Sequence, residues 1–163
     1  MISIPSCTRE VRWELRAEPG VTAECRAVLR VTLAAWDLHD LIDDVLVVVT
    51  ELLANALVHG GPPVHIAIGT APDTVTGSVT DRGAGWPRLC PAGNESEHGR
   101  GLRIVAALTD AWGVEPVEDG IGKTIWFTRA RRPDTGPPGR GPEPPAMAKP
   151  ARNSGTRPAQ SGE

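Results

Sequence analysis

The sequence predicts an α+β fold, a two-layer α/β sandwich in which a mostly antiparallel, mixed sheet carries helices on one face. Two patterns support this fold class. One long segment places apolar residues at helical spacing, and several short segments alternate apolar and polar residues and lie in close pairs. Adjacent strands joined by short turns form antiparallel hairpins, which need helices on only one face. A chain of 163 residues is long enough for one such domain with a substantial core.

The first third of the chain predicts one strand and two helices. Residues 11–17 alternate and predict the strand, which Pro19-Gly20 ends, and residues 21–37 predict the first helix. The second helix is predicted over 40–58, with Asp40 as its N-cap and Asp43 in its first turn. Its apolar positions form one stripe that we expect to be buried: Ile42, Val45, Leu46, Val49, Leu52, Leu53 and Ala56.

The middle of the chain predicts two hairpins separated by a loop and a short helix. Alternation and turn residues give the expected elements in order: a hairpin of strands 64–68 and 74–80, a loop over 81–98, a helix over 100–109, and a hairpin of strands 112–114 and 123–128. The predicted order of elements is therefore βααββαββ.

The C-terminal segment differs in composition from the rest of the chain. Residues 133–163 contain 8 of the 16 prolines, five glycines and almost no large apolar side chains. Such a segment buries too little apolar surface to offset the entropy of ordering it. We therefore expect a folded domain over residues 1–132 and a disordered Pro/Gly-rich tail over 133–163.

Charge, cysteine spacing and hydropathy exclude several classes of function. The tail has four basic and three acidic residues, which leaves the folded part a net charge of 13 − 17 = −4 and argues against direct nucleic-acid binding. Three cysteines without a CxxC pair predict neither a disulfide framework nor a zinc site. No leader and no apolar run of about 20 residues is present, so the sequence predicts a cytoplasmic protein that does not bind membranes.

Glu51 and Asn55 lie one helical turn apart, so their side chains share one face of the second helix. The amide oxygen of Asn55 is a suitable ligand for Mg²⁺, and the Glu51 carboxylate can orient or deprotonate an attacking hydroxyl or water. The alternative is that the pair belongs to the solvent-exposed face of an amphipathic helix. The strongly apolar composition of this helix favours a position near its packed side.

Asp81 follows a strand and precedes Arg-Gly-Ala-Gly. A carboxylate at this place can accept a hydrogen bond from the amino group of adenine, and Gly83 and Gly85 let the chain turn sharply close to a base. The alternative is an ordinary Asp-x-Gly turn at the end of a strand.

The segment Gly99-Arg100-Gly101-Leu102 opens the third helix. Free backbone N–H groups and the helix dipole favour anions at such a position, and phosphate is the expected ligand. The alternative is a flexible entry loop. Gly122-Lys123-Thr124 does not complete a phosphate-binding loop, because Val117 stands where its first glycine should be. The hydroxyl of Thr124 can nevertheless support the carboxylate that reads adenine.

Taken together, the segments ELLANALVHG, DRGAG, GRGLRIV and GKTIWF resemble the GHKL (Bergerat-fold) ATP-binding superfamily. Within it, the chain is most similar to anti-sigma-factor serine/threonine kinases and their stand-alone relatives. The resemblance covers about residues 10–130. It implies the Bergerat ATP-binding fold, with ATP and Mg²⁺ held between the sheet and the helices.

The resemblance also implies a role for each motif residue. Glu51 would be the catalytic carboxylate and Asn55 the Mg²⁺ ligand, and Asp81, supported by Thr124, would read the adenine amino group. The glycines and their neighbours would shape the base pocket and close over the phosphates: Gly83, Gly85, Gly99, Arg100, Gly101 and Leu102. The expected partners are a sigma factor, an antagonist protein phosphorylated on Ser or Thr, and a second copy of the chain in a homodimer.

Three other functions fit parts of the sequence. A non-catalytic regulator would bind ATP and sequester a partner without transferring phosphate. The catalytic piece of a histidine kinase is disfavoured, since the chain has no room for a dimerising helical hairpin with a phosphoacceptor histidine. An α/β domain without a nucleotide would show no thermal shift with Mg-ATP.

Overall fold

The computed structural model describes residues 7–86, 100–118 and 120–131. In these residues the order of elements is the predicted βααββαββ, with one additional 3₁₀ turn before the second helix. The elements are β1 (Arg9–Leu15), α1 (Val21–Ala35), a 3₁₀ turn (His39–Leu41), α2 (Ile42–His59), β2 (Val64–Ala71), β3 (Thr74–Asp81), α3 (Arg100–Leu108), β4 (Ala111–Pro116) and β5 (Lys123–Ala130).

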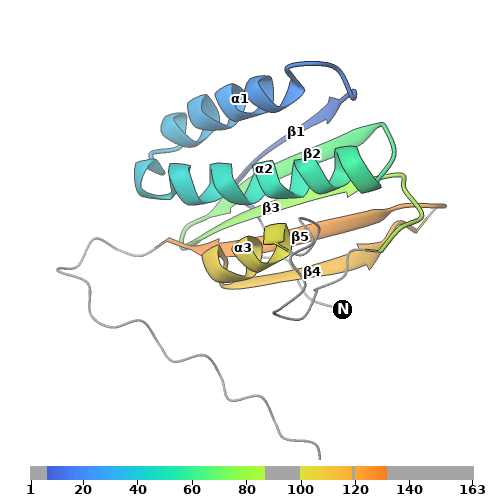
Figure 1. Ribbon diagram of the computed structural model, residues 1–163. Helices are drawn as coiled ribbons and strands as arrows, with labels where there is room; N and C mark the ends of the chain where they lie inside the picture. Colours follow the sequence, from blue (N-terminus) through green and yellow to red (C-terminus); the bar gives the residue numbers. More distant parts are fainter. Residues whose placement is uncertain (1–6, 87–99, 119, 132–163) are drawn as a thin grey trace, which may run out of the picture. The chain divides into compact units, whose positions relative to one another are not determined.

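The five strands form one sheet in the order β1-β2-β3-β5-β4, and all four pairings are antiparallel. The helices α1, α2 and α3 lie together against one face of this sheet (Figure 1). The predicted α+β sandwich with helices on one face is therefore confirmed. β5, the last strand in the sequence, pairs with β3 and so lies inside the sheet, while β4 forms its edge.

The core fills the space between the sheet and the helices. Every residue of the stripe predicted on α2 is buried, from Ile42 to Ala56. Alternate residues of the strands face these side chains, as the period of two requires. They include Val64, Ile66, Ile68, Val75, Val79, Ile125 and Phe127.

The N-terminus of α2 differs from the prediction. Asp40 is not the N-cap, because residues 39–41 form the 3₁₀ turn and α2 begins at Ile42 without a side-chain cap hydrogen bond. Asp43 and Asp44 lie in its first turn, where negative charge is favourable to the helix dipole. The carboxylate of Asp44 is paired with Arg129 of β5 at 2.7 Å, which fastens this end of α2 to the sheet.

The tail predicted over 133–163 and most of the loop predicted over 81–98 lie outside the described residues. Within the part of the chain that is described, no helix is long and apolar enough to cross a membrane.

Candidate functional site

The long helix α2 carries Glu51 and Asn55 at the margin of its packed side. Both side chains are half-buried, whereas Leu52, Leu53 and Ala56 between and beside them are buried in the core. The exposed residues of the same stretch, Ala54 and Val58, point away from the core. Glu51 and Asn55 therefore do not lie on the outer solvent-exposed face of the helix, which was the alternative interpretation of this pair.

The first turn of α3 lies directly against Glu51 and Asn55. A Cβ atom placed on Gly101 would be 2.9 Å from Oε2 of Glu51 and 3.6 Å from Nδ2 of Asn55. Leu102 is buried and anchors α3 in the core, while Arg100 is exposed. The structure thus brings the N-terminal turn of α3 to the carboxylate and the amide, and only a glycine fits between them without displacing Glu51.

Asp81 ends β3 and is almost fully buried, with 2% of its surface exposed. Its Oδ1 atom accepts a hydrogen bond of 2.8 Å from the backbone N–H of Gly83. The ammonium group of Lys123 lies 3.0 Å from Oδ1 and 3.0 Å from Oδ2. Lys123 is the residue directly opposite Asp81 in the β3–β5 register, so the two side chains leave the sheet on the same face.

Close backbone contacts join the C-terminal end of α2 to the loop that follows β3. A Cβ on Gly60 would lie 2.5 Å from Cγ of Asp81, and a Cβ on Gly83 would lie 2.5 Å from Cα of Gly60. Gly85 is exposed, and a Cβ placed on it would lie 3.6 Å from the carbonyl oxygen of His59, which is an ordinary van der Waals contact. Glycine is required at 60 and 83 because no side chain fits between the two segments.

One helix therefore connects the two groups of predicted site residues. Glu51 and Asn55 face the start of α3, and Gly60 at the end of α2 touches Asp81. The helix rises about 1.5 Å per residue, so Asn55 and Gly60 are separated by about 7–8 Å along its axis. Asn55 and Asp81 thus lie near the same end of α2 and not on opposite surfaces of the molecule.

The structure places Thr124 differently from the role expected of it. Its hydroxyl group lies 2.8 Å from that of Thr80, its partner across the β3–β5 register, on the face of the sheet away from the helices. The residue that supports Asp81 is Lys123, which the sequence reasoning did not assign. A signal was present, because Lys123, Ile125 and Phe127 alternate along β5 and this spacing puts the lysine on the buried face.

Gly99, predicted to close over the phosphates with Arg100 and Gly101, lies outside the described residues. Among the residues that are described, no three His, Cys, Asp or Glu side chains come together as a cluster that could hold a metal ion. A magnesium ion bound at Asn55 would consequently need oxygen ligands from the nucleotide phosphates and from water, which is how Mg²⁺ is usually held beside a nucleotide.

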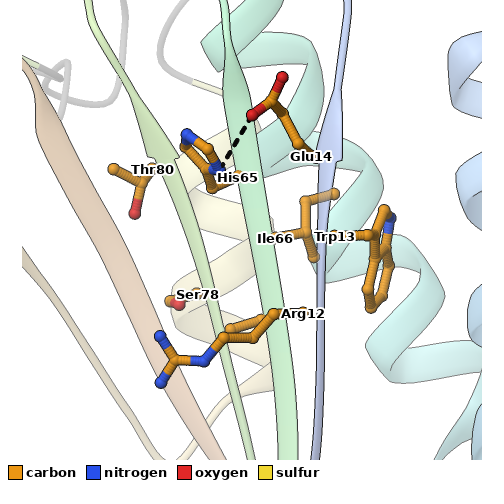
Figure 2. A pocket seen from close by; sticks show the side chains of 8 residues that line it. Arg12, Trp13, Glu14, His65, Ile66, Ser78 and Thr80 are labelled. Atoms are coloured by element: carbon orange, nitrogen blue, oxygen red, sulfur yellow. Dashed lines mark ion pairs between the residues drawn. The ribbon is translucent and has the colours of Figure 1, made fainter.

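A separate hollow of about 300 Å³ opens on the sheet (Figure 2). Its polar lining comes from β1, β2 and β3. Glu14 on β1 and His65 on β2 are directly opposite in the register, with His65 Nδ1 4.0 Å from Oε2 of Glu14. None of the predicted site residues lines it: its walls are Arg12, Trp13, Glu14, His65, Ile66, Ala67, Ser78 and Thr80. This hollow is therefore distinct from the residues gathered around α2.

The fold and the site together define a class of protein. The antiparallel sheet with helices on one face brings a carboxylate, an amide and the glycine-containing start of a helix to one place, with a buried aspartate nearby. The family model described as "Histidine kinase-like ATPase domain" matches residues 15–129. The chain belongs to this family, as its resemblance to the GHKL superfamily predicted.

One solved structure gives a more specific likeness. The chain is similar to the RsbU and RsbW domains of Rv1364c from Mycobacterium tuberculosis, with 25% sequence identity and a TM-score of 0.55. The match covers 77% of this chain and 33% of that one, so this chain spans about a third of the length of the solved chain. No curated protein matches the sequence significantly.

Proposed function

We propose that this protein binds Mg-ATP and transfers the γ-phosphate to a serine or threonine of a partner protein, and that it regulates transcription by sequestering a partner. The observation that carries this proposal is the contact of Gly101 with Glu51 and Asn55. It places the N-terminal turn of a helix, which favours phosphate, beside a carboxylate and an amide that suit phosphoryl transfer. Membership of an ATPase-domain family supports the nucleotide.

Each residue has a defined task in this proposal. The amide oxygen of Asn55 binds Mg²⁺, which neutralises charge on the phosphates when the nucleotide is bound. The Glu51 carboxylate accepts the proton of the attacking hydroxyl group as the new P–O bond forms and ADP leaves. Arg100, exposed at the start of α3, is free to reach a phosphate, and Leu102 holds that turn in place. Asp81 accepts a hydrogen bond from the base, and Gly83 and Gly85 form the adjoining backbone.

The proposed partners are a sigma factor and an antagonist protein that receives the phosphate. The similarity to a protein with an RsbW domain supports this choice of regulatory system, and the resemblance to anti-sigma-factor kinases also supports a homodimer. The second candidate is a non-catalytic module that binds ATP and sequesters a partner. In this candidate the half-buried Glu51 carboxylate beside Gly101 orders bound water and accepts no proton from a substrate hydroxyl group.

Melting curves and phosphate transfer test the two candidates in turn. Mg-ATP at about 100 times its Kd should stabilise the protein by roughly 2.7 kcal/mol, which raises the melting temperature measurably. The protein is then incubated with γ-labelled ATP and captured partner proteins, in parallel with Glu51→Gln. We expect the variant to bind Mg-ATP and to transfer no label. Partner capture by the native protein without any transfer would select the non-catalytic module, and an absent thermal shift would exclude both candidates.

A further inference from the structure

The ion pair between Asp81 and Lys123 is the most buried ion pair in the described part of the chain. The side chain of Lys123 is 4% exposed and that of Asp81 3%, whereas the next most buried pair, Arg129 with Asp44, is 21% and 34% exposed. Removing two charges from water costs several kcal/mol per ion, and well-packed apolar residues are often at least as stabilising. Stability alone therefore does not explain why this sequence keeps a lysine here.

The pair keeps hydrogen-bonding capacity that it does not use internally. A carboxylate has about four acceptor sites. Among the described residues, Oδ1 of Asp81 receives the Gly83 N–H and the Lys123 ammonium, while Oδ2 receives the ammonium alone. The ammonium has three N–H donors, and the Asp81 carboxylate is the group it contacts among the described residues. An acceptor on Asp81 and a donor on Lys123 thus remain side by side.

The surrounding backbone fixes both groups in place. Gly60 leaves no space beside the Asp81 carboxylate, and Gly122, at a φ of +148°, packs its backbone against the Asp81 carbonyl oxygen. The Asp81–Lys123 register across β3 and β5 sets the direction of both side chains. The acceptor and the donor are consequently preorganised, as a specificity-determining pair must be.

We propose that Lys123 reads the base together with Asp81, as the donor of an acceptor–donor pair that selects adenine. The Watson–Crick edge of adenine presents an amino donor next to the N1 acceptor, so the Asp81 carboxylate takes the amino hydrogen and the Lys123 ammonium donates to N1. Guanine presents an O6 acceptor and an N1–H donor in the same two places, and both contacts become repulsive. This inference rests on the proposed function, because it assigns the base-reading contacts of the same site.

The test changes single atoms of the nucleotide and leaves the protein intact. Binding of Mg-ATP to the full chain is measured by calorimetry beside two analogues, 1-deaza-ATP, which lacks the N1 acceptor, and purine riboside triphosphate, which lacks the 6-amino group. We expect each analogue to bind roughly tenfold to a hundredfold more weakly than ATP, the range for a hydrogen bond to a charged group. GTP should bind more weakly than ATP by at least about tenfold.

The variant Lys123→Met, combined with the same analogues, gives a double-mutant cycle of nucleotide affinities in which one change is in the protein and the other in the ligand. It removes the ammonium and keeps most of the side-chain length, so ATP and 1-deaza-ATP should bind this variant with equal affinity, while the loss caused by removing the 6-amino group should persist. Arg30→Met is the matched control, since it removes one exposed cation on α1 and should leave every nucleotide affinity unchanged. If Lys123→Met does not fold, the analogues with the native protein still decide the matter.

The possible failures are distinguishable. If the native protein binds ATP and 1-deaza-ATP equally well, Lys123 does not read N1, and the inference is overturned while the proposed function stands. Tighter binding of GTP than of ATP overturns it as well, because the pair would then read a 6-oxopurine. If no nucleotide binds, the proposed function itself fails.

Discussion

The tight contact between Gly60 and Asp81 predicts a loss of stability that depends on the structure and not on the proposed chemistry. In Gly60→Ala the new Cβ would lie 2.5 Å from Cγ and 2.7 Å from Oδ1 of Asp81, and it would also meet the Ala56 carbonyl oxygen. Optimal contacts between carbon atoms are about 3.5–4.0 Å, so Asp81 has to move by roughly 1 Å. Asp81 cannot move freely, because Lys123 and the Gly83 N–H hold its carboxylate.

The expected loss of stability follows from two contributions. Overpacking a filled position costs about 1–3 kcal/mol, and complete disruption of a buried ion pair costs about 3–5 kcal/mol. Because the ion pair is distorted and not removed, we expect a total of about 3 kcal/mol. For a folded part of this size, this corresponds to a decrease in melting temperature of roughly 10 °C. The affinity for Mg-ATP should decrease as well, because Asp81 is displaced.

Gly61→Ala is the matched control in the neighbouring residue. Its nearest atoms, in Arg82 and Gly83, would lie 3.4–3.5 Å from the new Cβ, which is ordinary packing. Both variants are melted by circular dichroism at one pH and salt concentration, and Mg-ATP is titrated into each. We expect Gly61→Ala to melt within about 2 °C of the native protein. Equal melting temperatures for the two variants would refute the reasoning, because the steric difference between residues 60 and 61 would then have no energetic effect.

Three further predictions concern other positions. Asn55→Ala should abolish the part of the nucleotide affinity that depends on Mg²⁺, measured as binding with magnesium and with excess chelator. Gly101→Ala should change the melting temperature by only a few degrees, since the gain in helix propensity of about 1 kcal/mol offsets the crowding, yet displacement of Glu51 should reduce the transfer rate about a hundredfold. Burial, reinforced by the neighbouring Glu24, raises the pKa of the Cys25 thiol from 9.0 to about 11. The folded protein therefore favours the neutral thiol, and the stability that this thiol contributes is complete below pH 9 and is lost as the pH rises to about 11. Native protein and Cys25→Ala should therefore converge in unfolding free energy by roughly 2–3 kcal/mol between pH 8.5 and 11 in urea titrations, and a constant difference would contradict the shift.

The elements were predictable from the sequence because their periods are strong and their breakers are clear. The stripe on α2 and the alternation of β2, β3 and β5 each reflect burial on one face, which a single sequence displays directly. Their ends were less predictable. The 3₁₀ turn at 39–41 displaces the start of α2 from Asp40 to Ile42, because backbone and packing interactions, and not a side-chain cap, decide where this helix begins.

Strand order was not predictable, and the partner of Asp81 was predictable only in part. The sequence indicates that β4 and β5 form a hairpin, but it does not show which of the two joins β3. That choice depends on packing between distant segments. The β3–β5 register then decides that Lys123, and not Thr124, lies opposite Asp81. The alternation of Lys123 with Ile125 and Phe127 indicates that Lys123 lies on the buried face, but the sequence does not show that this strand pairs with β3 in a register that sets Lys123 opposite Asp81.

Because α2 carries one site group and its C-terminal end adjoins the other, we expect the proposed functions of the two groups to be separable. Glu51 and Asn55 lie on α2 and contact α3, and Gly60, which directly follows α2, contacts Asp81; the core-facing residues of this helix are buried. A rigid helix keeps the spacing between the groups constant. Changes at Gly60 or Lys123 should consequently alter which base is bound and how tightly, while the transfer rate of the saturated protein stays close to native. Changes at Glu51 or Gly101 should have the opposite effect. A Lys123 variant that lost transfer at saturating ATP would show that the base-reading group also sets the position of the phosphates.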